Sequence, residues 1–115
     1  MSQPINIYSI TPLVIDIDAE TKKNINYRRI IHTGIYSQTV LMSIGPHSEI
    51  GHKINPNNDQ SMKIQSGTGY AQIENTYYPL KPGIWLDIPA GTYHNIVNES
   101  NEDLKTYIVY SPPLH

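Results

Sequence analysis

Histidine is the residue type in this chain that most directly suggests chemistry, because it is the commonest metal ligand and a frequent acid–base catalyst. The sequence of 115 residues contains no cysteine and five histidines, which are His32, His47, His52, His94 and His115. Disulfide scaffolds, zinc ribbons and thiol nucleophiles are therefore excluded. Whether any of the histidines contributes to a site depends on the elements that carry them.

His94 belongs to a pattern of turn-forming residues, G-x5-P-x-G-x2-H-x3-N, which runs from Gly83 through Pro89 and Gly91 to Asn98. The pattern predicts a strand after a tight turn at Gly83, a second turn at Pro89 and Gly91, and a returning strand that carries His94. Asn98 is expected to end that strand as a turn residue. Because side chains alternate along a strand, His94 should share its face with every second residue after it.

The rest of the chain reads as short alternating or apolar runs between Gly, Pro and Asn clusters, which is typical of an all-β protein. Residues 18–24 fit either one helical turn or a polar loop, and residues 55–60 are expected to form a loop. About ten short strands at this spacing predict a sandwich or barrel in a single domain. The predicted strands span residues 13–17, 27–32, 35–44, 49–54, 61–65, 70–74, 77–80, 84–88, 93–97 and 104–110.

Net charge and hydropathy limit the kinds of partner that this protein is expected to bind. Eight Lys and Arg against ten Asp and Glu give a formal charge of −2, without the basic excess of a duplex-DNA binder. The chain has no apolar run long enough for a membrane span, and its first residues lack the order of a signal peptide. With no cysteine, these features predict a soluble cytoplasmic protein that binds neither nucleic acid nor membrane.

The pattern from Gly83 to Asn98 is also the second signature of the cupins, and the sequence resembles small single-domain cupins over residues 24–115. Asp59-Gln60, Gly67 and the run from Ile88 to Asn95 carry much of this resemblance. Members of this group are often described as mannose-6-phosphate-isomerase-like. The resemblance implies an all-β, double-stranded β-helix fold (a cupin jelly-roll barrel) over residues 24–115, preceded by an N-terminal arm and first strand in residues 1–23.

The first cupin signature, G-x5-H-x-H-x3,4-E-x6-G, supplies three further ligands that join the histidine of the second signature around a divalent metal. Counting back from Gly67 places Gln60 at the glutamate position and Asn55 and Lys53 at the two histidine positions. Amide oxygens are weak ligands for transition metals, and a protonated lysine repels a cation. His94 alone remains a good donor, so these departures from the signature predict a site without a metal cofactor.

A relocated metal site at His47, His52 and His94 is the alternative. His52 is one residue from the Lys53 position, and a step of one residue along a strand turns the side chain to the opposite face. Such a site would need a bulge, so surface positions for His47 and His52 are favoured.

These positions together predict a metal-free pocket that binds a small polar or anionic ligand. Some cupins that act on nucleotide-linked sugars use no metal and rely on a histidine base. By the same reasoning, His94 is the expected catalytic base, and Lys53 is expected to stabilise an enolate oxyanion in a sugar isomerase or epimerase. The expected substrate-binding residues are Asn55, Gln60, Tyr93 and Tyr107.

A non-catalytic ligand-binding or structural cupin is the main alternative function, and a metal-dependent enzyme is less favoured. An open pocket with Lys53 and His94 pointing inward favours an enzyme, whereas a barrel plugged by Ile and Leu side chains favours a scaffold. In either case a homodimer is expected, because a small barrel gains stability by covering an apolar outer face. The first dozen residues are the element expected to cross to the partner subunit.

Overall fold

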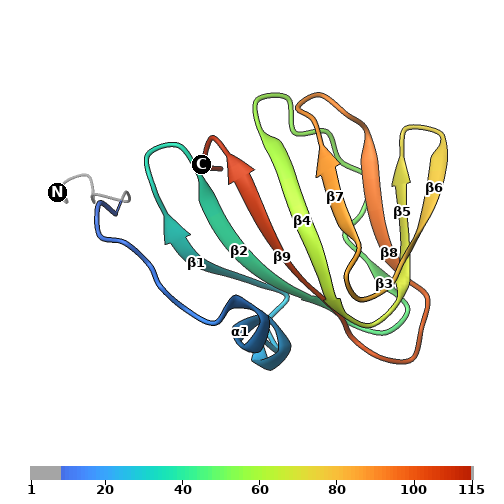
Figure 1. The fold of residues 1–115 in the computed structure, drawn as a ribbon. Coiled ribbons are helices and arrows are strands. Elements are labelled where there is room, and N and C mark those ends of the chain that lie inside the picture. The colour runs from blue at the N-terminus through green and yellow to red at the C-terminus, as the bar shows by residue number, and fades with distance from the viewer. Residues whose placement is uncertain (1–8, 115) are drawn as a thin grey trace, which may run out of the picture.

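The structure, a computed structural model, describes residues 9–114. Apart from one short helix, its regular secondary structure consists of antiparallel strands in two sheets (Figure 1). One sheet has five strands in the order β1-β2-β9-β4-β7, and the other has four in the order β3-β8-β5-β6. This arrangement confirms the predicted all-β, double-stranded β-helix. The strands are β1 (Arg28–Thr33), β2 (Gln38–Ile44), β3 (Ser48–Glu49), β4 (Asp59–Ser66), β5 (Gly69–Ile73), β6 (Thr76–Leu80), β7 (Trp85–Ile88), β8 (His94–Asn98) and β9 (Leu104–Ser111).

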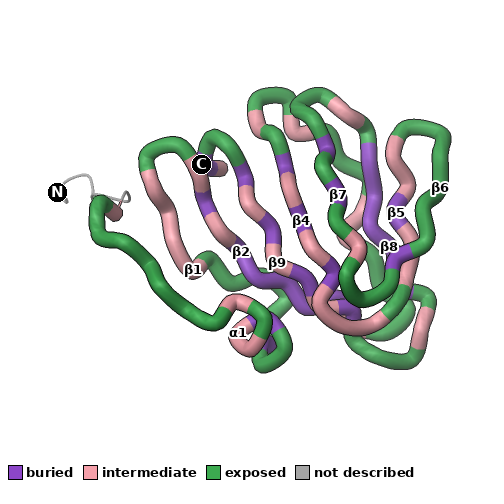
Figure 2. The backbone as a smooth tube through the Cα atoms, viewed as in Figure 1, coloured by how far each residue is buried: buried purple, intermediate pink, exposed green. Residues whose placement is uncertain are grey.

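Alternation along the strands builds the core between the two sheets (Figure 2). In β9 every second residue from Leu104 to Tyr110 is buried, and the residues between them are half-buried on the outer face. Register then places β2 and β4 on either side of β9, so that their inward residues form continuous rows. The apolar cluster comprises Val40, Met42, Ile44, Met62, Ile64, Ala71, Leu80, Leu86, Ile88, Ile96, Leu104, Ile108 and Tyr110.

The strand predicted at residues 13–17 is wrong, because residues 13–16 have no regular secondary structure and helix α1 (Ile17–Lys23) begins at the last residue of the segment. Asp16 is the N-cap, and its carboxylate accepts a hydrogen bond of 3.0 Å from the backbone N–H of Ala19. An N-cap aspartate satisfies a free N–H group of the first helical turn, which favours a helix over the extended form at this point. Of the two interpretations of residues 18–24, the helix is therefore the correct one.

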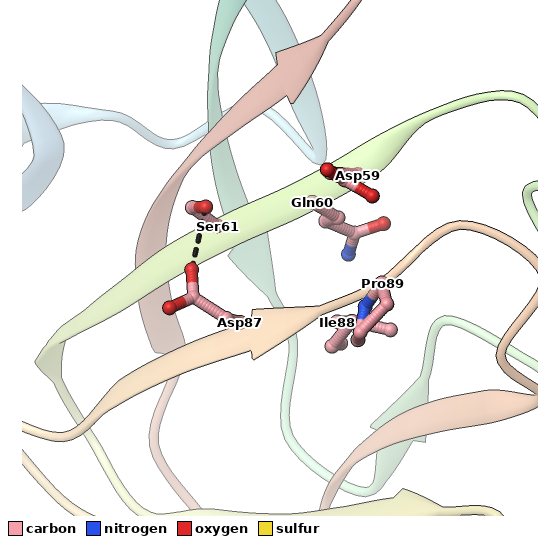
Figure 3. A pocket seen from close by; sticks show the side chains of 6 residues that line it. All are labelled: Asp59, Gln60, Ser61, Asp87, Ile88 and Pro89. Carbon is pink, nitrogen blue, oxygen red and sulfur yellow. Dashed lines mark hydrogen bonds between the residues drawn. The ribbon is translucent and has the colours of Figure 1, made fainter.

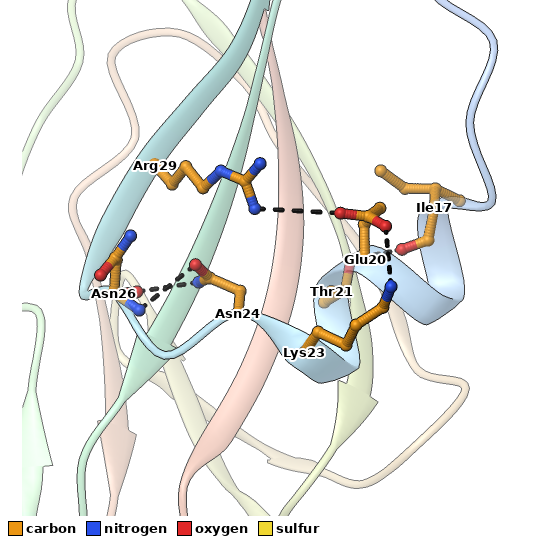
Figure 4. A network of polar contacts seen from close by, with 7 residues as sticks. All are labelled: Ile17, Glu20, Thr21, Lys23, Asn24, Asn26 and Arg29. Carbon is orange, nitrogen blue, oxygen red and sulfur yellow. Dashed lines mark hydrogen bonds and ion pairs between the residues drawn. The ribbon is translucent and has the colours of Figure 1, made fainter.

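Helix α1 packs against the outer face of the five-stranded sheet, held by basic residues from three strands. Arg29 on β1 lies 3.9 Å from Glu20, as Figure 4 shows, and Lys63 on β4 lies 3.6 Å from Asp18. Lys105 on β9 donates a 2.7 Å hydrogen bond to the backbone carbonyl at the end of the helix. Residues 17–23 therefore belong to the folded domain and do not form a free arm.

Three strand boundaries differ from the sequence prediction. Residues 35–37 form a turn before β2, and the strand predicted at residues 49–54 is reduced to the two residues of β3 plus an isolated bridge at Lys53. Asp59 and Gln60, expected in a loop, are the first residues of β4. The predicted hairpin is confirmed as β5 and β6, which are joined by a turn at Glu74 and Asn75.

Gly67, the last glycine of the first cupin signature, has a structural role. Its φ of +86° lies in the left-handed region that side chains rarely adopt, and a Cβ atom there would overlap the backbone oxygen of Asp103. Glycine is therefore required where β4 turns toward β5.

The predicted N-terminal arm falls largely on residues 1–8, which lie outside the described residues. Ser9, the first described residue, donates a 2.7 Å backbone hydrogen bond to the carbonyl oxygen of Thr33 at the end of β1. Within residues 9–114 no helix is both long and apolar enough to cross a membrane.

Candidate functional site

A cavity of about 70 Å³ lies inside the barrel, with walls from both sheets. Lys53, Asn55, Gln60 and His94, the four residues predicted to form a pocket, all line it. Gln60 comes from β4 in the five-stranded sheet and His94 from β8 in the four-stranded sheet, while Lys53 and Asn55 lie in the segment between β3 and β4. The apolar cluster borders the cavity at Met42, which also lines it.

His94 is the most tightly held residue of the cavity and is only 2% exposed. Its backbone N–H and C=O form paired 2.9 Å hydrogen bonds with those of Lys53, so the two residues lie directly opposite each other. The ring Nδ1 lies 2.9 Å from the carbonyl oxygen of Thr92. Because a carbonyl only accepts hydrogen bonds, Nδ1 carries the hydrogen, and Nε2 of the neutral ring keeps a free lone pair.

Asn55 and Gln60 form a pair of amide side chains on the cavity wall. Asn55 Nδ2 donates a 2.9 Å hydrogen bond to Gln60 Oε1. The backbone carbonyl of Asn55 accepts a 2.9 Å bond from Gly91 N–H, which ties this segment to the turn before β8. Gln60 is 3% exposed. The pairing leaves the Gln60 amino group and the Asn55 oxygen as the groups available to a ligand.

Lys53 differs from the other three residues because it is exposed, so it lies on the open side of the cavity. It forms no ion pair within residues 9–114. Its backbone bridge to His94 fixes where the side chain begins, and the ammonium group is free to reach a ligand.

The donor chemistry at these four positions does not fit a divalent cation. Of the four side chains, only the imidazole of His94 is a strong donor for a transition metal. The oxygen of Gln60 already accepts from Asn55, and the Lys53 ammonium would repel the ion. Across the described residues, no three or more His, Asp or Glu side chains are grouped to hold a metal.

His47 and His52 do not join His94. His47 Nε2 lies 2.7 Å from Asn101 Oδ1, and His52 Nε2 lies 3.2 Å from Gln72 Oε1. Both histidines are exposed. The relocated metal site is therefore not formed, and the surface positions favoured for the two residues agree with the structure.

Tyr93 and Tyr107 are not among the residues that line the cavity, which corrects their expected role. Tyr93 is 38% exposed, and its ring stacks on His52 at a centroid distance of 5.1 Å. Tyr107 belongs to the half-buried, outward-facing set of β9. Proximity to the signature in sequence misled the prediction, because neighbouring strand residues face opposite sides of a sheet.

Sequence reasoning missed Tyr27, Arg28 and Tyr110, which line the cavity from β1, the residue before it, and β9. Arg28 on β1 lies opposite Met42 on β2, so both side chains are on the inner face, where Met42 is buried and Arg28, on the edge strand, is exposed. Burial raises the pKa of the Tyr110 hydroxyl, and the nearby Arg28 guanidinium acts in the opposite direction. Strand register brings these residues together, and the sequence carries no local signal for it.

The C-terminal residues close one side of the cavity. Leu114 lines the cavity and also packs against the apolar cluster. Asn58 holds this segment in place, because its Nδ2 donates a 2.7 Å hydrogen bond to the carbonyl oxygen of Pro112.

A second hollow of about 130 Å³ lies between β4 and β7, and Figure 3 shows its side chains. Ser61 Oγ donates a 2.6 Å hydrogen bond to Asp87 Oδ1. Asp59 Oδ1 accepts a 2.9 Å bond from the backbone N–H of Ala90. Both carboxylates thus hold neighbouring strands and a turn together, which accounts for their presence without a ligand.

Comparisons with known proteins agree with this fold. No family model matches the chain. The uncharacterized protein L612 of Acanthamoeba polyphaga mimivirus is 44% identical over 106 residues, covering 89% of this chain and 66% of its own length. The chain spans less than two thirds of the length of the curated relatives it matches.

Two solved structures are similar to this chain in fold. The cupin domain of Cnp3 from Schizosaccharomyces pombe superposes with a TM-score of 0.70 at 18% identity, over 73% of this chain and 62% of that one. BH2720 from Bacillus halodurans superposes with a TM-score of 0.90 at 35% identity, over 96% of this chain and 89% of that one. The protein therefore has the double-stranded β-helix fold of the cupins. Within that fold, the chain belongs to the same family as BH2720.

Proposed function

We propose that this protein is a metal-free cupin that binds a small polar ligand beside His94 and moves a proton on it, as a sugar isomerase or epimerase does. The observation that carries the proposal is the orientation of His94. Its Nδ1 is held by the Thr92 carbonyl, so Nε2 is the free basic nitrogen of a side chain that lines the cavity. A general base needs such an orienting partner. Placement in the mannose-6-phosphate-isomerase-like group and a cytoplasmic location belong to this proposal.

The other cavity residues support the same chemistry. His94 Nε2 removes a proton from a carbon next to a carbonyl, and the electron pair moves onto the carbonyl oxygen to give an enolate. The Lys53 ammonium, which has no ion-pair partner in the described part of the chain, stabilises that oxyanion. Return of the proton to the other face of the same carbon yields the epimer. Return to the former carbonyl carbon, with the proton of the neighbouring hydroxyl passing to the enolate oxygen, yields the isomer. Asn55 and Gln60 orient the ligand through their remaining amide groups.

Solvent exchange in deuterium oxide tests the proton transfer directly. Wild-type protein should incorporate deuterium next to the carbonyl of fructose 6-phosphate or fructose, as followed by proton NMR. His94→Gln should lower the exchange rate roughly 100-fold or more, because it removes the base. His52→Gln is the matched control, since His52 lies outside the cavity, and it should leave the rate unchanged. Equal rates in wild type and His94→Gln, or no exchange with either compound, would reject the proposal.

A non-catalytic, structural homodimer is a second candidate function, favoured by exposed apolar side chains at the edge of the five-stranded sheet. Ile30 on the edge strand β1 is 48% exposed, and Ile35 and Tyr36 in the following turn are 56% and 82% exposed. A second copy is the occupant that suits this edge, because two identical edge strands can pair antiparallel about a two-fold axis.

Light scattering coupled to size exclusion tests the dimer. Wild-type protein should elute with twice the chain mass, and Ile30→Glu should shift it to the monomer mass by placing a charge in the apolar contact. Tyr77→Glu is the control, because Tyr77 lies on β6 in the other sheet and is 61% exposed. A wild-type monomer at micromolar concentration would contradict the proposal.

A further inference from the structure

The cavity beside His94 carries two positive side chains and no negative one. Arg28 and Lys53 line it, and no Asp or Glu does. Ion pairs within residues 9–114 use Lys23, Arg29 and Lys63, so neither cavity cation has an ion-pair partner among those residues. We infer that the group of the ligand that enters this cavity is an oxyanion, either a carboxylate or a phosphate. This inference rests on the proposed function, because it takes the same cavity as the ligand site.

Arg28 and Arg29 show how the sheet separates two adjacent cations. Arg29 faces outward and lies 3.9 Å from Glu20 of helix α1. Arg28 faces inward opposite Met42, and its charge acts on the pKa of Tyr110, which lies two strands away on β9. Arg28 and Tyr110 line the same cavity. A planar guanidinium presents paired N–H donors that match the two oxygens of a carboxylate or phosphate.

The uncharged groups of the cavity also favour an anion. Tyr110 is 7% exposed, and because burial raises its pKa, its hydroxyl is neutral at physiological pH and can donate. Within the described residues, that hydroxyl has no hydrogen-bond partner. The amino group of Gln60 is a further donor, because its oxygen is already engaged by Asn55. With Arg28 and Lys53, these groups give the cavity more hydrogen-bond donors than free acceptors, which are the Asn55 oxygen and His94 Nε2. An excess of donors suits an oxyanion, which only accepts hydrogen bonds.

The size of the cavity limits how much of the ligand it can hold. A volume of about 70 Å³ is well below the roughly 300–1,000 Å³ of cavities that enclose a whole drug-sized ligand. It suits one charged head group. The remainder of the ligand would then lie on the exposed side of the cavity, where Tyr27 and Lys53 are located.

Titration calorimetry with simple anions tests this assignment. Inorganic phosphate and acetate represent the two head groups, and glucose serves as a neutral comparison. We expect wild-type protein to bind one of the two anions. Arg28→Gln should weaken that affinity at least tenfold, about 1.4 kcal/mol. Arg28→Lys should keep part of it, because the charge remains while the paired donors are lost. Arg29→Gln is the matched control, since Arg29 lies next in sequence but on the opposite face.

Fold integrity is checked on each variant by circular dichroism and thermal melting. Binding weakened equally by Arg28→Gln and Arg29→Gln would overturn the inference, because it would reflect general surface charge. Binding of glucose but of neither anion, with deuterium exchange that depends on His94, would overturn the inference and leave the proposed function intact. Anion binding that depends on Arg28, without deuterium exchange, would support the inference and reject the proposed catalytic function.

Discussion

We expect the substitution Asn98→Asp to lower the free energy of unfolding by roughly 3–5 kcal/mol, the largest effect of any single polar substitution considered. Asn98 is fully buried. Its Nδ2 donates to the carbonyl oxygens of Ile44, Gly45 and Glu102 at 2.9, 3.0 and 2.7 Å. Its Oδ1 accepts from Ser100 N–H and Oγ at 2.9 and 2.8 Å. An aspartate removes the donor and places a buried charge against three carbonyl oxygens.

Urea denaturation followed by circular dichroism measures this loss. Asn98→Ala should also be destabilising, by about 2–4 kcal/mol, because it leaves buried carbonyl groups without donors. Asn75→Asp, on the exposed hairpin turn between β5 and β6, is the control and should change stability by less than about 0.5 kcal/mol. A loss below about 1 kcal/mol in Asn98→Asp would show that the network is not a main support of the fold.

The combined variant Lys53→His, Asn55→His and Gln60→Glu should acquire a divalent metal site. The structure brings these three positions together with His94 around one cavity. What the wild-type cavity lacks is side chains that are good metal ligands. Imidazole and carboxylate groups are strong ligands for Zn²⁺, Ni²⁺ and Mn²⁺. We expect close to one metal ion per chain in the variant after dialysis, and a substoichiometric amount in wild type. Bound metal should also stabilise the variant, by roughly 2.7 kcal/mol at a free concentration 100-fold above Kd.

Inductively coupled plasma mass spectrometry gives the metal content, and melting with and without a chelator gives the stabilisation. Adding His94→Ala to the combined variant should reduce metal binding, because it removes one of the four ligands. Wild-type protein that retains a stoichiometric metal would refute the metal-free proposal. A combined variant without metal would show that the four side chains do not converge closely enough.

Strands in this protein were predictable wherever the chain alternates between apolar and polar residues and then meets a turn. The hairpin of β5 and β6 and the signature strands β7 and β8 are examples. Residues 13–17 are a counterexample, because apolar Leu13, Val14 and Ile15 suggested a strand. The capping carboxylate of Asp16 and the packing of α1 against the sheet decided against it. A short apolar run does not by itself distinguish a strand from a segment that leads into a helix.

The candidate site was predictable to the extent that it depends on signature spacing. Counting from Gly67 and Pro89 selected Lys53, Asn55 and His94, and the structure places these three residues at one cavity. Asn98 ends β8 as predicted, and its Oδ1 accepts from the backbone N–H of Ser100 two residues on. Its amide is also the centre of a buried hydrogen-bond network, which the sequence did not indicate. Nothing in the local pattern indicates the second role, because the carbonyl groups of Ile44 and Gly45 lie far away in the chain.

Local sequence therefore specifies the strands, the turns and the loss of metal ligands, since each depends on residue types a few positions apart. Tertiary structure alone decides the charge of the cavity. Arg28 and Arg29 are identical in type and adjacent in the chain, yet one lines the cavity and the other contacts Glu20. The physical reason is that the pleat of a strand sends successive side chains to opposite faces, and the register of β1 on β2, set by pairing between strands, decides which of the two faces the cavity.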